Sequence, residues 1–294
     1  MNIADFKTTD DNHVYDLTDD SPDGGVPLLK FPIIEQLGIA EHGFTTRAGG
    51  VSRGIFSTLN VSYTRGDDLT AVDENYKRIA VSMHADAADF VLSDQTHTTN
   101  IRKVTGDDRG KGIVREKDYH DIDGLVTDEP GIVLSAFFAD CVPVFFVDPL
   151  HHAAGISHSG WRGTIHRMGR ETIRVMQEAY GSRPKDLICA IGPSICQSCY
   201  EVSEDVAVRF MEEFQGHGEQ LCYLKSPGKY QLNLWKANEL VLLEAGILPE
   251  HMAVTNICTC CNARLLFSHR ASHGRRGNLG AFIKLKEKLR GKDF

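Results

Sequence analysis

Residues 132–147 read IVLSAFFADCVPVFFV, which is the most apolar stretch of the sequence. Its two nearly continuous apolar runs, 132–138 and 142–147, predict strands that are buried on both faces. Asp140 and Pro143 interrupt the stretch, and it is shorter than the roughly 20 apolar residues that span a bilayer. We therefore predict two core strands with a polar break between them.

Strands and helices alternate on both sides of this stretch. Further strands are predicted at 42–47, 90–92, 124–127, 153–157, 187–191 and 252–257. Helices are predicted at 73–89, at 164–180, after a cap at Ser203, and from about 233 to 246. A charged terminal segment follows at 284–290. This order indicates an α/β protein without a strict βαβ repeat.

The length of 294 residues allows one large domain or two small ones with a substantial core. Residues 1–30 are rich in Asp, Thr, Pro and Gly, which predicts a loosely attached N-terminal extension. We therefore expect one domain, residues 31–294, that begins near Phe31.

Composition and charge exclude several classes of function. The formal net charge of −8 argues against a general nucleic-acid or membrane-surface binder, because phosphate contacts need a cationic face. The N-terminus lacks the basic start and apolar core of a secretory signal, so we expect a cytoplasmic protein. In that compartment most of the 8 cysteines are expected to be thiols.

Three candidate metal ligands each follow a predicted strand, namely His97, Cys141 and His158. One thiolate and two imidazoles make a ligand set for an open zinc site, in which a fourth position is left for water or substrate. The three residues are too far apart in sequence for a zinc finger, so tertiary structure would have to assemble the site. The same residues also form a possible Cys-His nucleophile pair, and a lone cysteine is often just a small apolar core residue.

The remaining cysteines suggest a second, separate hypothesis. Cys196-x-x-Cys199 has metal-ligand spacing, and Cys258-x-Cys260-Cys261 could complete a closed structural zinc site with it. Metal analysis that finds two zinc ions per chain would support this hypothesis.

Several short motifs together carry a resemblance to a known family. They are Gln95-Thr96-His97, Asp123-Gly124-Leu125-Val126-Thr127, Ala139-Asp140-Cys141-Val142-Pro143, His158-Ser159-Gly160-Trp161-Arg162-Gly163, Gly192-Pro193-Ser194-Ile195, Cys199-Tyr200-Glu201-Val202 and Ile257-Cys258-Thr259. In this order the sequence resembles the YfiH family, also called the laccase-domain or multicopper polyphenol oxidase family. The resemblance extends from about Phe31 to the C-terminus.

The resemblance implies a single-domain layered α/β/β/α fold with mixed sheets. It also implies a zinc ion held by His97, Cys141 and His158. The implied activities are phosphorolysis of adenosine, inosine, guanosine or methylthioadenosine, and deamination of adenosine. Purine nucleosides and phosphate would then be the partners, with the chain a monomer or homodimer. Some family members are assigned a role in editing peptidoglycan precursors.

True laccase chemistry needs many imidazoles, typically in His-x-His pairs that join copper centres. The chain has 13 histidines and no His-x-His pair, which argues against a multicopper oxidase. Copper outcompetes zinc at most nitrogen and sulfur sites, so binding of a copper ion by the triad is still expected to be possible in vitro.

Each implied reaction needs further residues. Deamination by a zinc-activated water requires an acid/base group, and Asp140 beside Cys141 is the nearest candidate. As an alternative, the Asp140 carboxylate accepts backbone hydrogen bonds at a strand end. Phosphorolysis requires guanidinium groups to hold the phosphate, and the candidates are Arg47 and Arg162. The alternative is that each of these arginines forms a surface or helix-terminal salt bridge. A basic cluster near the C-terminus, Ser268-His269-Arg270 and Arg275-Arg276, adds Arg270 as a substrate-binding candidate.

Two readings of a different kind stay open beside the zinc-dependent phosphorylase and deaminase. In one, Cys141 is a nucleophile activated by His158, as in amidase-type hydrolases. In the other, the chain is a metal-binding or partner-binding module without turnover.

Overall fold

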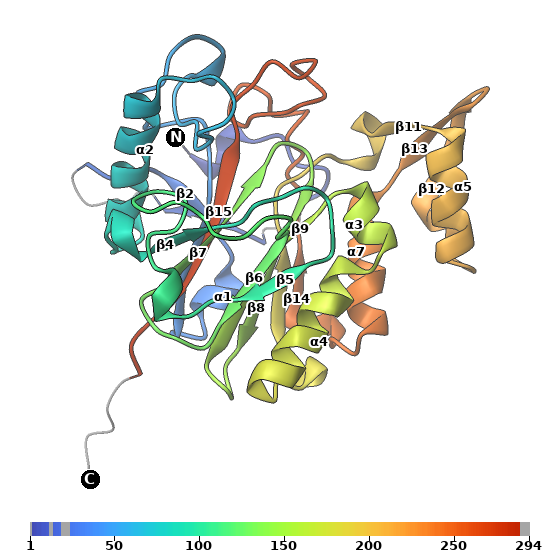
Figure 1. The fold of residues 1–294 in the computed structure, drawn as a ribbon. Helices are drawn as coiled ribbons and strands as arrows, with labels where there is room; N and C mark the ends of the chain where they lie inside the picture. The colour runs from blue at the N-terminus through green and yellow to red at the C-terminus, as the bar shows by residue number, and fades with distance from the viewer. Residues whose placement is uncertain (1, 12–13, 19–23, 289–294) are drawn as a thin grey trace.

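The computed structural model describes residues 2–11, 14–18 and 24–288, and it has four layers (Figure 1). Helix α2 (Leu69–Ser82) lies on one outer face, and helices α3 (Trp161–Ile165), α4 (Met168–Tyr180) and α7 (Leu234–Glu244) lie on the other. Two six-stranded sheets lie between these helices. The α/β/β/α arrangement implied by the resemblance is confirmed.

The first sheet packs against α2 and is mostly antiparallel, with a parallel pair at one edge. In spatial order its strands are β1 (Asp16–Thr18), β2 (Leu28–Lys30), β3 (Ala40–Thr45), β15 (Leu279–Leu285), β7 (Val133–Phe138) and β4 (Phe90–Leu92).

The second sheet packs against α3, α4 and α7 and has a parallel pair at each edge. Its order is β14 (Met252–Val254), β10 (Ile188–Ile191), β8 (Val142–Asp148), β9 (Ala153–Ser159), β6 (Gly124–Thr127) and β5 (Ile101–Lys103). The apolar stretch 132–147 therefore supplies one central strand to each sheet, because β7 and β8 belong to different sheets.

A smaller unit projects from one side of the layers (Figure 1). It contains the sheet of β11 (Glu201–Ser203), β13 (Lys229–Leu232) and β12 (Cys222–Ser226), together with α5 (Glu204–Glu213) and α6 (Gly218–Leu221). The short helix α1 (Pro32–Glu35) precedes β3. Among the described residues, no helix combines the length and apolarity needed to cross a bilayer.

The hydrophobic core fills the three spaces between the four layers. Alternate residues of one strand serve different spaces, because successive side chains of a strand point to opposite faces. In β8, Phe145 and Val147 pack between the two sheets, whereas Val144 and Phe146 pack toward the outer helices. Both faces of β7 and β8 are covered, which is why these strands read as continuous apolar runs.

Part of the segment expected to be an N-terminal extension is integrated into the fold. Strand β1 pairs with β2, and β2 pairs with β3 in the first sheet. Tyr15, Leu28 and Leu29 are buried, and the Tyr15 hydroxyl donates to or accepts from Thr255. Because residues 1–30 are mostly polar, their composition does not indicate that these few apolar side chains are buried. Parts of this segment, residues 1, 12–13 and 19–23, lie outside the described residues.

The prediction of a charged terminal segment at 284–290 was wrong at its first residues, because Lys284 lies inside the central strand β15. Its ammonium group donates to the carbonyl oxygens of Met83 (2.6 Å) and His84 (2.7 Å) and pairs with Glu41 (2.8 Å). These partners offset the cost of burying a charge. Residues 289–290 lie outside the described residues.

The helix expected at 164–180 is two helices, α3 and α4, which meet at Arg167. This residue has a left-handed backbone (φ 60°), and its guanidinium donates to Glu213 (3.0 Å) and Glu244 (2.7 Å) and stacks on Phe214. The helix expected at 73–89 runs instead from Leu69 to Ser82, because the Asp68 side chain caps its start by accepting from the Thr70 amide.

Truncation of Phe282 is expected to destabilise the fold strongly. Phe282 is fully buried in β15 and contacts the rings of Tyr76 and Phe90 between the first sheet and α2. Phe282→Ala should lower the free energy of unfolding by about 3–5 kcal/mol, as for other buried aromatics. Chemical denaturation measures this, with Leu224→Ala as the control because Leu224 is 60% exposed. Equal losses in both variants would contradict this packing.

Candidate functional site

The structure brings the three expected metal ligands together. His97 follows β4, Cys141 lies in the break between β7 and β8, and His158 lies in β9. Their ligand atoms all lie within 4.8 Å of one another, and Cys141 Sγ is 4.0 Å from His97 Nε2. The imidazole rings of His97 and His158 meet edge to face with their centroids 4.9 Å apart.

The backbone around the triad takes up rare conformations that direct these side chains inward. His97 (φ 68°) and Asp140 (φ 88°) are both in the left-handed region, which costs free energy for residues other than glycine. Gly160 is also required here, since a Cβ atom at this position would lie 2.9 Å from the His97 ring and 3.1 Å from Cys141 Sγ. Such strain is typical of functional sites.

Asp123 organises two of the three candidate ligands, a role that its local sequence does not indicate. Its fully buried carboxylate accepts hydrogen bonds from His158 Nδ1 (2.7 Å) and from the amides of Thr96 (3.1 Å), His97 (3.1 Å) and Thr98 (2.8 Å). The bond to Nδ1 leaves His158 Nε2 free to face Cys141, which is how second-shell carboxylates orient metal-binding histidines. Asp123 begins the family motif Asp123-Gly124-Leu125-Val126-Thr127, and that was its only signal in the sequence.

Electrostatic coupling within the triad favours a thiolate and an imidazolium in the metal-free chain. Burial raises the pKa of Cys141, but His158 and His97 outweigh this and lower it to about 6. Burial lowers the pKa of His158, but Cys141 and Asp123 outweigh this and raise it to about 9. Burial also raises the pKa of Asp123, yet the hydrogen bond and charge of His158 and the amides of Thr98 and Thr96 hold it below its usual value.

Alkylation of Cys141 in metal-free protein is expected to have an unusual pH dependence. Because the thiolate is the reactive form, the rate should level off above pH 6 and fall below it, whereas an ordinary thiol reacts faster up to a pKa of about 8.5. Iodoacetamide labelling followed by peptide mass spectrometry measures this profile. If the midpoint of the rate-against-pH curve lies near the pKa of an ordinary thiol, the coupling is contradicted. Added zinc should suppress the alkylation of Cys141.

The donor set fits a zinc ion. Zinc takes imidazole nitrogen at about 2.0 Å and thiolate sulfur at about 2.3 Å, and catalytic sites use three protein ligands. His97, Cys141 and His158 supply such a set, with His158 already oriented by Asp123. His97 is exposed whereas His158 is buried, so the group of three side chains is open to solvent on the His97 side.

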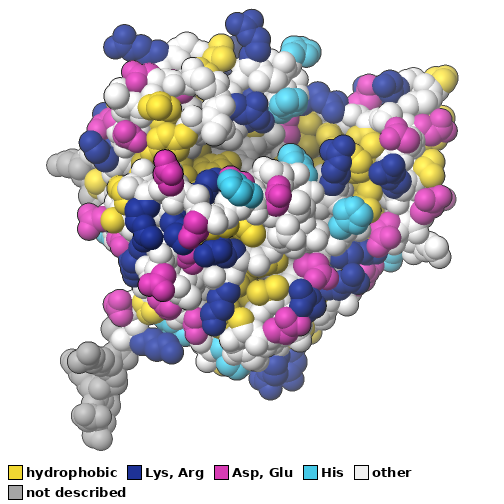
Figure 2. Space-filling view, viewed as in Figure 1, with side chains coloured by type: hydrophobic (Ala, Val, Ile, Leu, Met, Phe, Trp, Pro, Cys, Tyr) yellow, Lys and Arg dark blue, Asp and Glu magenta, His cyan; other side chains and the backbone are white. Residues whose placement is uncertain are grey.

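The triad lies in the wall of a cavity of about 410 Å³, a volume in the range of small-molecule sites. The rest of the lining consists of residues 61–65, 92–95, 112, 117, 137–139, 276 and 278. The cationic side chains in this lining are Arg65, Lys117 and Arg276. Elsewhere on the face seen in Figure 2, acidic and basic side chains are intermixed.

Arg276 is the most distinctive of these cations. It is 9% exposed, and its guanidinium donates through Nη1 to the Gly277 carbonyl and to Asn278, while its buried Nε has no hydrogen-bond partner among the described residues. Burial and the nearby charge of Arg65 lower its pKa to about 10, so it stays protonated at neutral pH. Only its place in the basic cluster 275–276 marked it in the sequence.

Asp140 is held on both carboxylate oxygens. Thr259 Oγ1 donates to one (2.6 Å), and the backbone amide of Arg270 donates to the other (2.6 Å). The backbone carbonyl of Asp140 also accepts from the Ile195 amide (3.0 Å). These contacts match the alternative in which Asp140 braces surrounding loops at a strand end.

The three arginines proposed for substrate binding lie outside the lining of this cavity. Arg47 donates to the carbonyl oxygens of Ser57 and Ala263 (both 2.8 Å) and stacks on Phe267. Arg270 donates to the carbonyl oxygens of Cys199 (3.4 Å) and Glu201 (2.7 Å). Arg162 is exposed and stacks on the ring of its neighbour Trp161.

Comparison with known proteins identifies the family. A family profile described as multi-copper polyphenol oxidoreductase laccase matches residues 41–286. The chain belongs to this family. The crystal structure of YlmD from Geobacillus stearothermophilus has the same fold as this laccase-domain chain, with a TM-score of 0.85 at 35% identity over 93% of this chain and 99% of that one.

Other members of the laccase-domain family are comparably similar. The purine nucleoside phosphorylase YlmD of Bacillus subtilis is 38% identical over 251 residues, which are 83% of this chain and 88% of the relative. The structure of the Bacillus licheniformis hypothetical protein YfiH gives a TM-score of 0.84 at 35% identity over 88% of this chain and 96% of that one. The resemblance to the YfiH family is therefore confirmed.

Proposed function

We propose that the chain is a zinc-dependent purine nucleoside phosphorylase that also deaminates adenosine. The observation that carries the proposal is one cavity with His97, Cys141 and His158 in its wall and the guanidinium groups of Arg65 and Arg276 in the same lining. The names of relatives, purine nucleoside phosphorylase in Bacillus subtilis and Deinococcus radiodurans among them, support this choice of substrate.

His97, Cys141 and His158 would hold the ion, and Asp123 would keep His158 in the tautomer that presents Nε2. A zinc ion bound there supplies a Lewis acid with one position open to substrate or water. Copper is the alternative ion for the same donors. We do not propose multicopper oxidase chemistry, because among the described residues this triad is the one group containing histidine that could hold a metal.

We assign phosphate binding to Arg65 and Arg276 in place of Arg47, Arg162 and Arg270. In phosphorolysis a phosphate oxygen bonds to the anomeric carbon while the bond from that carbon to the purine nitrogen breaks. The phosphate must therefore be held by charged donors, and guanidinium groups suit it best. Arg47 and Arg270 lie outside the cavity lining and donate to backbone carbonyls elsewhere. Arg65 and Arg276 both lie in the cavity lining, where a bound phosphate would meet their guanidinium groups.

We assign Asp140 a positioning role. Its two oxygens accept from Thr259 and Arg270, so it holds the loops beside Cys141 rather than moving protons to substrate. In deamination water adds to C6 of adenosine and ammonia leaves, and the bonded Asp140 carboxylate would take no direct part in this step.

Arg276→Gln is expected to raise the KM for phosphate about 10- to 100-fold, because a hydrogen bond to a charged group contributes about 1.5–3 kcal/mol. The KM for the nucleoside should change less. Steady-state kinetics at varied phosphate measures both constants. Arg275→Gln is the matched control, since Arg275 is the exposed neighbour outside the cavity. An unchanged phosphate KM in Arg276→Gln would remove this assignment.

The proposal is tested by incubating metal-replete protein with adenosine, with and without phosphate, and separating the products. Adenine that forms only with phosphate indicates phosphorolysis, and inosine without phosphate indicates deamination. If neither adenine nor inosine forms, and a chelator changes nothing in the mixture, the proposed function is rejected. Repeating the assay with inosine, guanosine and methylthioadenosine ranks the substrates.

The lowered pKa of Cys141 favours one second candidate, an amidase-type hydrolase with Cys141 as nucleophile and His158 as base. Editing of peptidoglycan precursors would fall in this class. The two candidates differ in their need for metal. Hydrolase activity that survives chelation and is lost on alkylation of Cys141 would favour the nucleophile, whereas activity restored by zinc favours the phosphorylase.

A further inference from the structure

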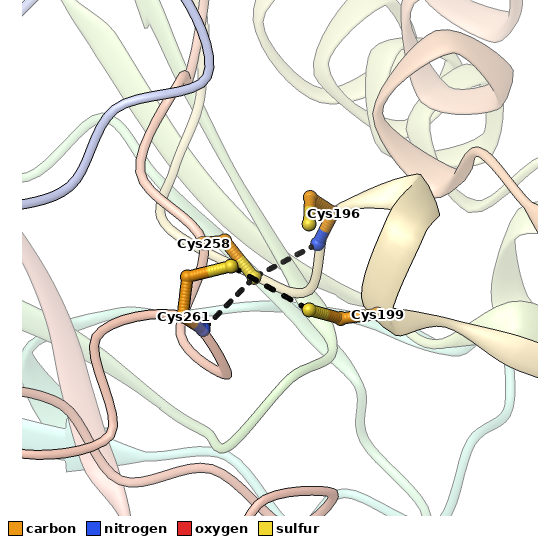
Figure 3. Close-up of side chains that lie close together, drawn as sticks. All are labelled: Cys196, Cys199, Cys258 and Cys261. Atoms are coloured by element: carbon orange, nitrogen blue, oxygen red, sulfur yellow. Dashed lines mark hydrogen bonds between the residues drawn. The ribbon is translucent and has the colours of Figure 1, made fainter.

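We propose that Cys196, Cys199, Cys258 and Cys261 form a structural zinc site that is separate from the triad. The four Sγ atoms lie within 4.8 Å of one another (Figure 3). Four cysteines that converge on one point are the ligand set of closed structural zinc sites. This inference does not depend on the proposed catalytic function, because it uses none of the same residues.

The ligands come as two C-x-x-C pairs on different loops. In the sequence only the first pair stands out by its spacing, because Cys260 lies between the members of the second pair. In the structure Cys258 and Cys261 form the second pair and Cys260 is left out of the cluster. The two loops are joined beside the cluster by a β-bridge between Ser194 and Cys258. Paired spacing of this kind is typical of zinc knuckles and ribbons.

Two backbone amides stabilise negative charge on Cys258 Sγ. The amides of Cys196 (3.3 Å) and Cys261 (3.4 Å) both donate to Cys258 Sγ (Figure 3). Donors to a ligating sulfur are second-shell contacts that stabilise the thiolate form needed for metal binding. Two such donors on one sulfur fit a coordinated thiolate better than a neutral thiol.

A metal ion accounts for the whole cluster, whereas a disulfide accounts for half of it. Cys199 Sγ and Cys261 Sγ are 3.5 Å apart, well beyond a covalent S–S distance of about 2.05 Å. A disulfide between them would leave Cys196 and Cys258 without a function. Thiolate ligands in a tetrahedral set favour zinc or iron, and we commit to zinc, which has no redox chemistry.

The cluster lies where a metal would stabilise both the fold and the neighbouring site. Its first loop leads directly into β11 of the projecting unit, so the ion would anchor that unit to the layers (Figure 1). Its second loop also contains Thr259, whose hydroxyl donates to the Asp140 carboxylate next to Cys141. The Cys199 carbonyl also accepts from Arg270. We therefore expect metal loss to reduce stability first and activity indirectly.

The test is the zinc content of the full chain, purified under reducing conditions, in three variants. Cys199→Ser with Cys261→Ser should lose about one zinc per chain and unfold at a lower temperature. Cys260→Ser is the matched control, half-buried in the same loop but outside the cluster, and should keep its zinc. His97→Ala with Cys141→Ala should lose only the zinc of the triad, which separates this inference from the proposed function.

Full zinc content in the Cys199 and Cys261 double variant would overturn the proposal, as would iron in place of zinc. A Cys199–Cys261 disulfide found by mass spectrometry in metal-free wild-type protein, with no zinc taken up after reduction, would also overturn it.

A second measurement covers the case in which the double variant does not fold. In native wild-type protein, N-ethylmaleimide should label Cys261 slowly although its side chain is exposed, and chelation should speed this labelling at least tenfold. Cys260 should show no such change. Equal labelling of Cys261 before and after chelation would overturn the site.

Discussion

Cys141→Ala is expected to lower kcat/KM for adenosine phosphorolysis by about a hundredfold or more. The substitution removes the one sulfur ligand of the triad, and loss even of an outer-shell partner costs about 10- to 100-fold in metal affinity or activity. Zinc bound at this site should fall in parallel. Because Cys141 is a half-buried side chain in the loop between β7 and β8, the fold should be retained.

Kinetics, zinc analysis and circular dichroism on the same preparation measure these effects. Cys260→Ala is the control, since it removes another half-buried thiol that lies outside both metal-binding groups. His97→Ala and His158→Ala should behave like Cys141→Ala. Activity within about twofold of wild type together with full zinc content in all three variants would remove the triad from the mechanism.

Asp123→Asn is expected to cause the second largest loss. An asparagine cannot present two acceptor oxygens, so its amide group would face donors that now bind a carboxylate, among them His158 Nδ1 and the His97 amide. Zinc affinity should fall about 10- to 100-fold. The free energy of unfolding should fall by about 1–3 kcal/mol, the cost of leaving a buried polar group unpaired.

Competition with a zinc chelator and chemical denaturation measure these two effects. Asp128→Asn is the matched control, because Asp128 is exposed and follows the other end of the same strand, β6. A loss of stability without a loss of zinc affinity would make Asp123 a purely structural residue.

The pH dependence of stability gives an independent readout for Asp123. Its folded-state pKa is held below the unfolded value of about 3.9, so its stabilising contribution is present above that value and is lost as pH falls through the folded pKa. Wild type should therefore lose stability more steeply than Asp123→Asn in acid. Parallel curves below pH 4 would contradict the coupling with His158.

The local elements of this fold were largely predictable. Continuous apolar runs predicted β7 and β8, and small residues with a polar end predicted β9, because burial on two faces leaves a pattern in neighbouring residues. The prediction was wrong for β15, where Lys284 suggested a charged tail. No residue near Lys284 in the sequence indicates that its ammonium group will pair with Glu41 and donate to the two carbonyl oxygens that follow α2.

The sequence indicated the three candidate ligands but little else of the site. His97, Cys141 and His158 stood at strand ends and in family motifs, and the structure brings their side chains together, whereas their role as ligands stays a prediction. Asp123 and Arg276 were not given roles, and Arg47 and Arg270 were proposed for substrate although their guanidinium groups bind backbone carbonyls. Whether an arginine faces a cavity or a carbonyl depends on segments far away in the chain.

The sequence by itself determined which segments are buried, which residues offer metal-binding atoms, and to which family the chain belongs. Tertiary structure decided that β7 and β8 lie in different sheets, that Asp123 reaches His158, and that two cysteine pairs converge in a group that does not include Cys260. The physical reason is the range of the forces involved. Burial and turn preference act on neighbouring residues, whereas a ligand set needs atoms from distant segments within a few ångströms, and only strand pairing and layer packing bring them there.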